Sequence, residues 1–325
     1  MPSSISRTRT TSRDARRLTP AALFAVLLAL VVALAGCGAD SDAAGSESAA
    51  ETSGGSFPVT VTGADGELTL EEQPEKIVSM SATTTEMLFA IGAGEQVAAV
   101  DDTSNYPADA PVTDLSAFTP NAEAIAGYEP DLVILSDDLN GIVDALDALA
   151  VPTLLLQAAT TVDDTYAQLE TLGDATGHPE DADEVIADVQ DRIAAAVESV
   201  PDDVEGMRVY HELDPSFYSA GSSTFIGSIY ALFGLENIAD SAADAAGGYP
   251  QLSAEYIVGQ APDLIVLADT KCCEQTAETV AQRPAFDTVP AVQEGRVLAA
   301  DDDIASRWGP RIADFAESVA GELQD

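Results

Sequence analysis

Short apolar runs bounded by turn residues recur along the chain, and one such pattern occurs twice. Residues 121–138 read NAEAIAGYEPDLVILSDD and residues 253–270 read SAEYIVGQAPDLIVLADT, with identical residues at nine of the 18 positions. Each copy begins as a short helix that a glycine ends, and turns at Pro-Asp into four apolar residues. An unbroken apolar run of this length is typical of a strand buried on both faces of a parallel sheet. The duplication therefore predicts two α/β lobes.

Further strands and helices are predicted around each copy. In the first half, residues 76–80 form a strand that leads into a helix beginning near Thr83 and ending at the turn 92–94. Thr83 and Glu86 have the spacing of a capping box, which fits a helix start at Thr83. The other predicted strands are 97–100, 153–156, 207–211 and 296–299, and the other predicted helices are 224–233, closed by Gly234, and the segment from Pro310 onward.

A long amphipathic helix is predicted between the two halves. Residues 178–201 begin with Pro179 and four acids, which suit a helix start, and they carry apolar residues on one face. About 20 residues at 1.5 Å each give a rod of roughly 30 Å. We therefore expect two lobes that can rock only a little.

The predicted fold class is α/β, with two Rossmann-like lobes joined by that one helix. Each lobe, residues 57–177 and residues 202–325, is expected to have a parallel central sheet. In front of the first sheet, residues 59–62 and 67–70 alternate around an Asp65-Gly66 turn, which predicts a β-hairpin.

The first 36 residues have the order of a secretory signal peptide, with arginines, an apolar stretch over 21–35 and then small residues. The stretch is shorter than the roughly 20 residues that cross a bilayer, so we interpret it as cleaved. Leu34-Ala35-Gly36-Cys37 resembles the lipobox of bacterial lipoproteins, in which the cysteine carries the lipid; a buried free cysteine is the alternative. Arg16-Arg17 leaves twin-arginine export open. Residues 37–56 lack large apolar residues and are expected to form a flexible acidic tether.

The charge of the chain excludes one class of partner. Lysine and arginine number 13 against 56 aspartates and glutamates, a formal charge of −43. A surface this acidic repels a phosphate backbone, so we expect no nucleic-acid partner. An acidic surface of this kind is also compatible with a saline habitat.

The order of these features resembles one protein family. The lipobox, the tether, the hairpin, PEKIVSMSATTTEMLFAIGAGEQVAAV, the paired EPDLVIL and APDLIVL blocks, the single linking helix and the closing SRWGPRIADFAESVA are together similar to substrate-binding lipoproteins of ABC importers. The family is that of the class III periplasmic binding proteins, which capture cobalamin, ferric siderophores and haem, and the resemblance covers nearly all of residues 57–325. It implies a chelate bound in the cleft between the lobes, no intrinsic cofactor and no enzymatic activity. It also implies delivery to a permease dimer with its ATPase subunits, from a position anchored by lipid to the outer face of the cell membrane.

The resemblance further implies that one glutamate at the top of each lobe docks onto arginines of the permease. By position in the repeated block these are Glu123 and Glu255. Two carboxylates related by the repeat suit a symmetric permease dimer. The alternative is that each is an acid in the first turn of a helix, stabilised by the helix dipole.

Ligand contacts are expected in the loops at the carboxyl ends of the strands, where open α/β sheets bind ligands. Tyr106 and Phe118 stand where relatives of this family place aromatic contacts. Trp308, the only tryptophan, lies between Arg307 and Arg311, which make a local positive site for a carboxylate or phosphate group; a core tryptophan beside exposed arginines is the alternative. The predicted ligand-binding residues are Ser81, Thr83, Thr84, Tyr106, Phe118, Glu212, Phe217, Tyr218, Tyr249, Arg307, Trp308 and Arg311.

Direct binding of a bare metal ion is disfavoured. His211-Glu212-Leu213-Asp214 has metal-ligating residue types, but His178 is the only other histidine and lies at the start of the linking helix. No multi-histidine site can form, so a metal is expected to arrive inside its chelator. The adjacent Cys272 and Cys273 form a vicinal disulfide or remain thiols.

Two other classes of function compete with solute capture. A surface-anchored lipoprotein enzyme is one, although the chain has no Gly-x-Ser-x-Gly, Ser-x-x-Lys, His-Glu-x-x-His or Gly-x-x-x-x-Gly-Lys motif. A scaffold without an import role is the other, and it predicts neither a cleft nor a small ligand.

Overall fold

The computed structural model describes residues 55–243 and 247–324 of the 325-residue chain. The predicted signal peptide, the lipidation site Cys37 and nearly all of the predicted tether lie outside the described residues. The lobes belong to one compact unit, Glu51–Asp325. Of the helices in the described part of the chain, none combines the length and the apolar character needed to span a membrane.

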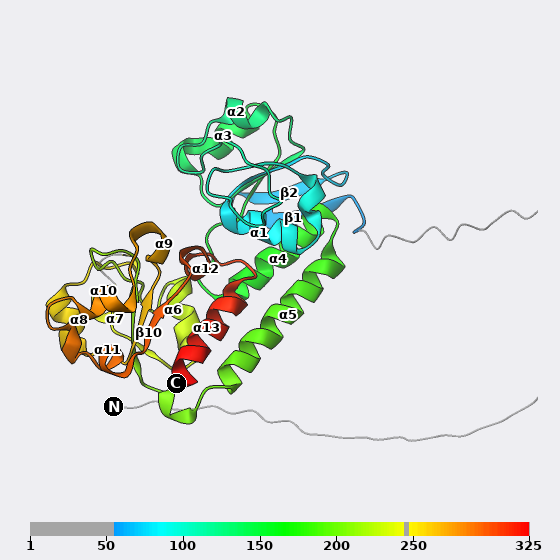
Figure 1. Cartoon of the computed structure of the whole chain (residues 1–325). Helices are drawn as coiled ribbons and strands as arrows, with labels where there is room; N and C mark the ends of the chain where they lie inside the picture. The colour runs from blue at the N-terminus through cyan, green and yellow to red at the C-terminus, as the bar shows by residue number, and fades with distance from the viewer. Residues whose placement is uncertain (1–54, 244–246, 325) are drawn as a thin grey trace, which may run out of the picture. The chain divides into compact units, whose positions relative to one another are not determined.

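Two parallel four-stranded sheets confirm the predicted fold class (Figure 1). In the first lobe the strand order is β4-β3-β5-β6, and in the second it is β8-β7-β9-β10, so both sheets have the same topology. Ile77 pairs with Leu132 in the first sheet, and Val209 pairs with Leu264 in the second. Each residue of the second pair lies 132 positions after its counterpart in the first pair, which is the offset of the sequence repeat. The strands are β3 Ile77–Met80, β4 Val97–Val100, β5 Leu132–Leu135, β6 Thr153–Leu155, β7 Arg208–Glu212, β8 Glu236–Asn237, β9 Leu264–Leu267 and β10 Val297–Ala299.

Helices cover both faces of each sheet. One face of the first sheet packs against α1, α4 and the start of α5, and the other against α2 and α3. In the second lobe, α6, α13 and the end of α5 cover one face, and α8, α10 and α11 cover the other. The helices are α1 Ala82–Ala90, α2 Ala122–Ala126, α3 Ile142–Asp147, α4 Val162–Thr176, α5 Pro179–Glu198, α6 Phe225–Leu232, α7 Asp240–Ala243, α8 Ala254–Gln260, α9 Thr270–Cys273, α10 Ala277–Ala281, α11 Pro290–Glu294, α12 Asp302–Ser306 and α13 Ile312–Gln324, with short 3₁₀ turns at Ala93–Gln96, Leu139–Gly141, Asp202–Val204 and Phe286–Thr288.

The linking helix is α5, as the sequence predicts, and it serves both hydrophobic cores. Ala182 and Ile186 pack into the core of the first lobe, whereas Val189, Ile193 and Ala196 pack into that of the second. Along its second part α5 contacts α13 (Figure 1). The buried stripe of one helix is thus shared between the lobes.

A helix that the sequence reading did not specify, α4, packs against α5. Gly173 lies inside α4, and a Cβ at this position would come within 2.6 Å of the Ala182 Cβ. The two helices therefore approach closely at this glycine. Gly177, with a φ of +79°, ends α4 before Pro179 starts α5.

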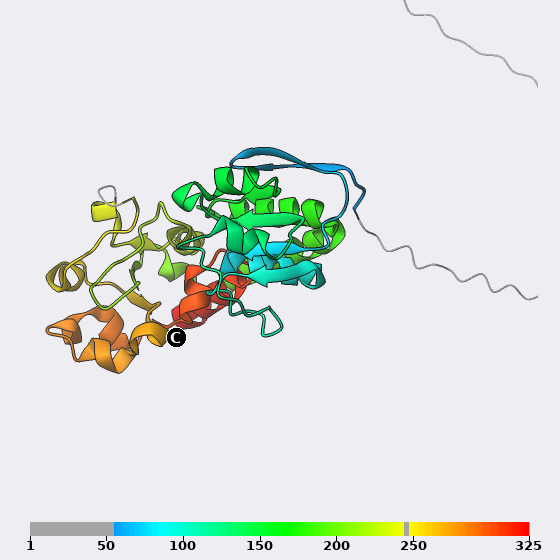
Figure 2. The ribbon, with the colours of Figure 1, turned by 90° about the horizontal axis from the view of Figure 1, so that it is seen from above.

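The predicted hairpin is present. Strands β1 Val59–Gly63 and β2 Gly66–Leu70 are antiparallel, with Val61 opposite Leu68. Strand β1 contacts α4 and β6, and in the view from above the blue hairpin extends along the first lobe (Figure 2). Val61 and Leu70 are buried there, so the hairpin closes part of the first core.

Helix α1 begins at Ala82, one residue before the predicted start near Thr83, but the predicted capping residue Thr83 is wrong by two residues. Ser81 is the N-cap, and its Oγ accepts the hydrogen bond of the Thr84 backbone N–H. Thr83 and Glu86 form no capping box, because the Glu86 carboxylate binds two arginines of the second lobe instead. The spacing of Thr83 and Glu86 fits a capping box, but the Glu86 carboxylate is bound by Arg307 and Arg311.

Candidate ligand-binding site

A cavity of about 360 Å³ lies where the first sheet ends, within the range of roughly 300 to 1,000 Å³ typical of small-molecule sites. It is formed by residues that follow β3, β4 and β5, together with the segment between α12 and α13 of the second lobe. Five of the predicted ligand-binding residues line it, namely Ser81, Thr83, Phe118, Arg307 and Trp308. The position agrees with the rule that open α/β sheets bind ligands outside the carboxyl ends of their strands.

The walls of this cavity combine aromatic and polar groups. Phe118 comes from the first lobe and is 71% exposed, and Trp308 comes from the second. Met80 and Leu135 supply apolar surface at the ends of β3 and β5, and Asp137 adds a carboxylate. The arrangement suits a ligand with a large apolar or flat face and a polar rim.

Asp101 shapes the loop that carries Phe118, and the sequence reading missed it. It is buried at the end of β4 and accepts hydrogen bonds from the backbone N–H of Thr103, at 3.2 Å, and from the Ser104 hydroxyl, at 2.5 Å. Its backbone also forms an isolated parallel β-bridge with Leu115, three residues before Phe118. The signal that could have found it is its place as the first polar residue after the apolar run 97–100.

The expected free positive site at Arg307 and Arg311 does not exist in this structure. Arg307 Nη1 lies 2.7 Å from Glu86 Oε1, and Arg311 Nε and Nη2 lie 2.9 and 2.5 Å from the two oxygens of the same carboxylate. Burial is the largest single influence on the pKa of Arg311 and would lower it, but the hydrogen bonds to Glu86 and the charges of Glu86 and other neighbours together raise it. The two cations are therefore engaged by an acid that the sequence reading treated as a helix cap.

Tyr106 faces a different space from Phe118. Its ring centroid lies 4.1 Å from Arg311 Cζ, a cation–π contact, and both residues line a hollow of about 240 Å³ with Phe89 and Pro310. Thr84 does not face the cavity either, because it is fully buried and its hydroxyl donates to the Ser81 carbonyl. These two predicted residues are thus separated from the five that meet in the cavity.

Glu212 is not at the surface of a cleft, contrary to the prediction. It is fully buried at the end of β7, and Arg283 of the segment after α10 binds both of its oxygens, at 2.6 and 2.5 Å. The Tyr210 hydroxyl donates a further hydrogen bond of 3.0 Å. The residue type suggested a ligand contact, but its partners make it part of the second core.

Asp269 follows β9 beside this ion pair and has no such partner. It is fully buried, and neither of its carboxylate oxygens is hydrogen-bonded within the described residues. Burial and the neighbouring Glu212 raise the pKa of Asp269 to about 7. Arg283 opposes this rise but is bound to Glu212.

Three of the aromatic residues predicted in the second lobe, Phe217, Tyr218 and Tyr249, do not line the cavity. Phe217 is half-buried, stacks on Phe286 with ring centroids 6.4 Å apart, and lies 5.4 Å from Arg283 Cζ. Tyr218 and Tyr249 are exposed on the second lobe. Tyr249 is only partly covered, but this partial burial raises the pKa of its hydroxyl, although a hydrogen bond with Thr224 opposes the rise.

Trp308 is both a cavity residue and a core residue, the two alternatives that the sequence left open. It lines the cavity, and it also packs against the cores of both lobes. Its Nε1 donates to Gln168 Oε1 at 3.0 Å, and its carbonyl accepts from the Thr165 hydroxyl at 2.9 Å. The tryptophan of the second lobe is therefore held by α4.

His211 is a buried core residue. Its Nδ1 lies 2.6 Å from the Tyr230 hydroxyl, and burial lowers the pKa of the imidazole to about 3. Within residues 55–243 and 247–324 no three His, Cys, Asp or Glu side chains are grouped as a metal site.

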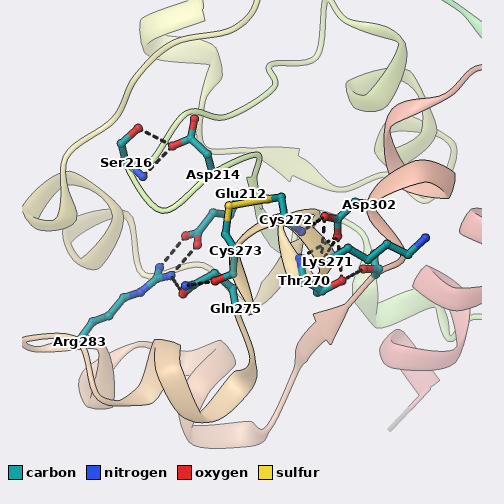
Figure 3. The surroundings of a disulfide bond; sticks show 11 residues. Glu212, Asp214, Ser216, Thr270, Lys271, Cys272, Cys273, Gln275, Arg283 and Asp302 are labelled. Atoms are coloured by element: carbon teal, nitrogen blue, oxygen red, sulfur yellow. Dashed lines mark hydrogen bonds and ion pairs between the residues drawn. A yellow bond between two sulfur atoms is a disulfide. The ribbon is translucent and has the colours of Figure 1, made fainter. Parts of the chain in front are cut away.

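Cys272 and Cys273 are joined as a vicinal disulfide at the end of α9 (Figure 3). The bond lies between the Arg283–Glu212 pair and the carboxylate of Asp302 (Figure 3). That carboxylate accepts hydrogen bonds from three successive backbone N–H groups at the start of α9, including those of Thr270 and Cys272, at 2.7 to 3.0 Å. Asp302 thus caps α9, in place of the inward-turned Asp269.

Glu123 and Glu255 occupy matching positions. Each is exposed in the first turn of its helix, α2 and α8 respectively. Both helices pack on the face of their sheet opposite α5, through Ile125 and Ile257. Figure 1 shows α2 and α8 on the sides of their lobes away from α5. No ion pair within the described residues involves either carboxylate.

Comparisons with known proteins agree with this architecture. A family model described as periplasmic binding protein matches residues 77–304. The uncharacterized ABC transporter substrate-binding lipoprotein YvrC of Bacillus subtilis (strain 168) is 29% identical over 313 residues, which are 93% of this chain and 96% of that protein. A cobalamin-binding protein of Halobacterium salinarum is 31% identical over 279 residues, 83% of this chain and 75% of that protein. The solved structure of a periplasmic haem-binding protein of Vibrio cholerae is 23% identical, with a TM-score of 0.68, and covers 77% of this chain and 99% of that chain.

Proposed function

We propose the following function for this chain, which belongs to the periplasmic binding protein family. The protein is the solute-binding component of an ABC importer and captures a metal chelate outside the cytoplasm. The observation that carries this proposal is the cavity at the end of the first sheet, which Arg307 and Trp308 of the second lobe help to enclose. A ligand there contacts both lobes at once.

The ligand is a bulky metal chelate, with cobalamin, a ferric siderophore or haem as the candidates. Phe118 and Trp308 offer aromatic surface for its apolar face, while Ser81, Thr83 and Asp137 offer hydroxyl and carboxylate groups for its rim. The metal stays within its chelator, and the chain's own residues bind and orient that molecule. The relatives named for cobalamin and haem support this class of ligand.

Fluorescence of Trp308, the only tryptophan, tests the proposal directly. We expect cyanocobalamin, ferrioxamine B or haemin to quench its emission saturably, and the chelate to be recovered unchanged. Phe118→Ala should weaken binding by about tenfold, as expected for an aromatic contact worth roughly 1.4 kcal/mol. Tyr128→Ala is the matched control, because Tyr128 is also exposed but does not line the cavity. Conversion of the chelate would support the alternative of a lipoprotein enzyme, and no quenching by any of the three would support a scaffold.

Docking to the permease is the second part of the proposal. Glu123 and Glu255 present carboxylates at repeat-related positions, which suits two arginine-bearing subunits related by a twofold axis. Glu123→Ala with Glu255→Ala should leave chelate affinity nearly unchanged and abolish uptake by cells. The control is Glu180→Ala, since Glu180 is an exposed first-turn acid of α5 on the other side of the sheet. A collapse of chelate affinity in the double variant would contradict the docking role.

Anchoring by lipid at Cys37 completes the proposal. The YvrC relative carries the word lipoprotein in its name, and Cys37 follows an apolar stretch and small residues in this sequence. Cys37→Ser should release the protein from membranes into the medium and abolish incorporation of radiolabelled palmitate. Retention of the variant on membranes would contradict the anchor.

A further inference from the structure

A single buried acid joins the two lobes beside the cavity. Glu86 lies in α1 of the first lobe and is 3% exposed. Its carboxylate receives three charged hydrogen bonds from Arg307 and Arg311 of the second lobe, at 2.5 to 2.9 Å. Both guanidinium groups are themselves largely buried, with exposed side-chain fractions of 12% and 17%. Salt therefore screens these contacts much less than it screens surface pairs.

Arg307 has further partners that fix its direction. Arg307 donates to Asn105 Oδ1 at 2.9 Å and to the Thr103 carbonyl at 3.1 Å, both in the first lobe. Its Nη2 also donates to Asp303 at 2.9 Å, and Asn105 Nδ2 donates to the same carboxylate at 3.1 Å. The loop after β4 and the segment after α12 are thus tied together by one connected polar network.

Trp308 lies between the two arginines that Glu86 holds. The backbone around it follows Glu86 closely, because a Cβ at Gly309 would lie 3.4 Å from Glu86 Oε2. Arg311 does not line the cavity, whereas Arg307 and Trp308 do. Glu86 itself is not a lining residue either. An acid outside the cavity therefore fixes both ends of the segment that forms one of its walls.

We propose that Glu86 is a positioning residue for ligand capture. Its carboxylate recruits Arg307 and Arg311 and so fixes the segment 306–311, with Trp308, against the first lobe. It acts through these arginines and not by touching the ligand. The part of this inference that concerns affinity rests on the proposed function, but the position of Trp308 does not.

Glu86→Gln tests the inference, with acrylamide quenching of the single tryptophan measured without ligand. We expect Trp308 to become more accessible to acrylamide, because an amide cannot hold two guanidinium groups. If about one molecule in ten keeps the segment in place, the apparent Kd for cyanocobalamin rises about tenfold. Glu212→Gln is the matched control, since Glu212 is also buried and bound by an arginine, and neither Glu212 nor Arg283 lines the cavity. It should reduce stability and leave Trp308 quenching and the Kd unchanged.

Arg311→Gln provides a second variant should Glu86→Gln fold poorly. Glu86→Gln leaves the buried Arg311 without its carboxylate partner, so the double variant, Glu86→Gln with Arg311→Gln, should be more stable than Glu86→Gln alone. In Arg311→Gln, Glu86 still has Arg307 as a partner. Arg311→Gln should also raise the Kd for cyanocobalamin although Arg311 lies outside the cavity. Unchanged Trp308 quenching in both single variants would overturn the inference, and so would altered quenching with an unchanged Kd. A wild-type protein that binds none of the chelates would instead contradict the proposed function, and the quenching result would still decide whether Glu86 fixes Trp308.

Discussion

Replacing Asp269 with asparagine should change how folding stability depends on pH. The Asp269 side chain is fully buried beside Glu212, and its two oxygens lack hydrogen-bond partners among the described residues. Arg283 is already bound through two hydrogen bonds to Glu212. Two carboxylates with one cation between them cannot both ionise cheaply, so a proton on Asp269 stabilises the folded state.

The magnitude follows from the pKa of Asp269, which burial and Glu212 raise to about 7. In the unfolded chain an aspartate titrates near about 3.9, so between these two pH values the folded state binds one more proton. The free energy of unfolding therefore falls by about 1.4 kcal/mol for each pH unit, or roughly 4 kcal/mol between pH 4 and 7. Above pH 7 this contribution stays constant.

Urea unfolding at constant ionic strength, followed by circular dichroism between pH 4.5 and 8, measures the effect. Asp269→Asn mimics the protonated acid, so its free energy of unfolding should lie within about 1 kcal/mol of the wild type near pH 4.5 and clearly above it near pH 8. The control is Asp137→Asn, because Asp137 occupies the equivalent position of the repeat and is exposed. A stability difference between Asp269→Asn and wild type that stays the same at every pH would refute the reasoning.

Three further predictions concern His211, Gly173 and the disulfide between Cys272 and Cys273. His211, whose pKa burial lowers to about 3, stays neutral while the unfolded histidine gains a proton below about pH 6.5, so folding should lose about 1.4 kcal/mol for each pH unit below that value; urea midpoints of His211→Gln should show a weaker loss. Gly173→Ala places a Cβ 2.6 Å from that of Ala182 and should lower stability by about 1 to 3 kcal/mol in thermal melts, despite the better helix propensity of alanine. Cys272→Ser with Cys273→Ser should leave the Kd for cyanocobalamin unchanged, because neither cysteine lines the cavity; thiol titration of the wild type should detect no free thiol at this pair.

The fold could be predicted from the sequence because its signals are local and repeated. The run Leu132–Leu135 and its copy Leu264–Leu267 are each a complete buried strand. The apolar face of residues 178–201 formed the linking helix as expected, since each turn of it meets one of the two cores. Helix α4 gave a weaker signal, because several of its buried positions are threonine, glycine and alanine.

The candidate site was only partly predictable, because charges find partners that lie far away in sequence. Glu86 and Arg311 are 225 residues apart, and nothing in the local sequence of either shows that they meet. The arginines stood out against so acidic a chain, but their accessibility depends on that distant acid. Glu212 and Arg283 mislead in the same way, since a carboxylate at a strand end suits a ligand and a core ion pair equally well.

The two lobes share a topology, yet their equivalent crevices differ, and the difference explains why the cavity lies on one side. In the first lobe the chain passes directly from Met80 at the end of β3 to the cap Ser81, which leaves the crevice between β3 and β5 open. In the second lobe eleven residues separate Glu212 from the cap Thr224, and within them Phe217 packs against Arg283, the partner of Glu212. An ion pair and an inserted loop thus fill the crevice that the repeat would otherwise open. The second lobe therefore contributes to the cavity through Trp308 and its neighbours, whose position depends on a carboxylate of the first lobe.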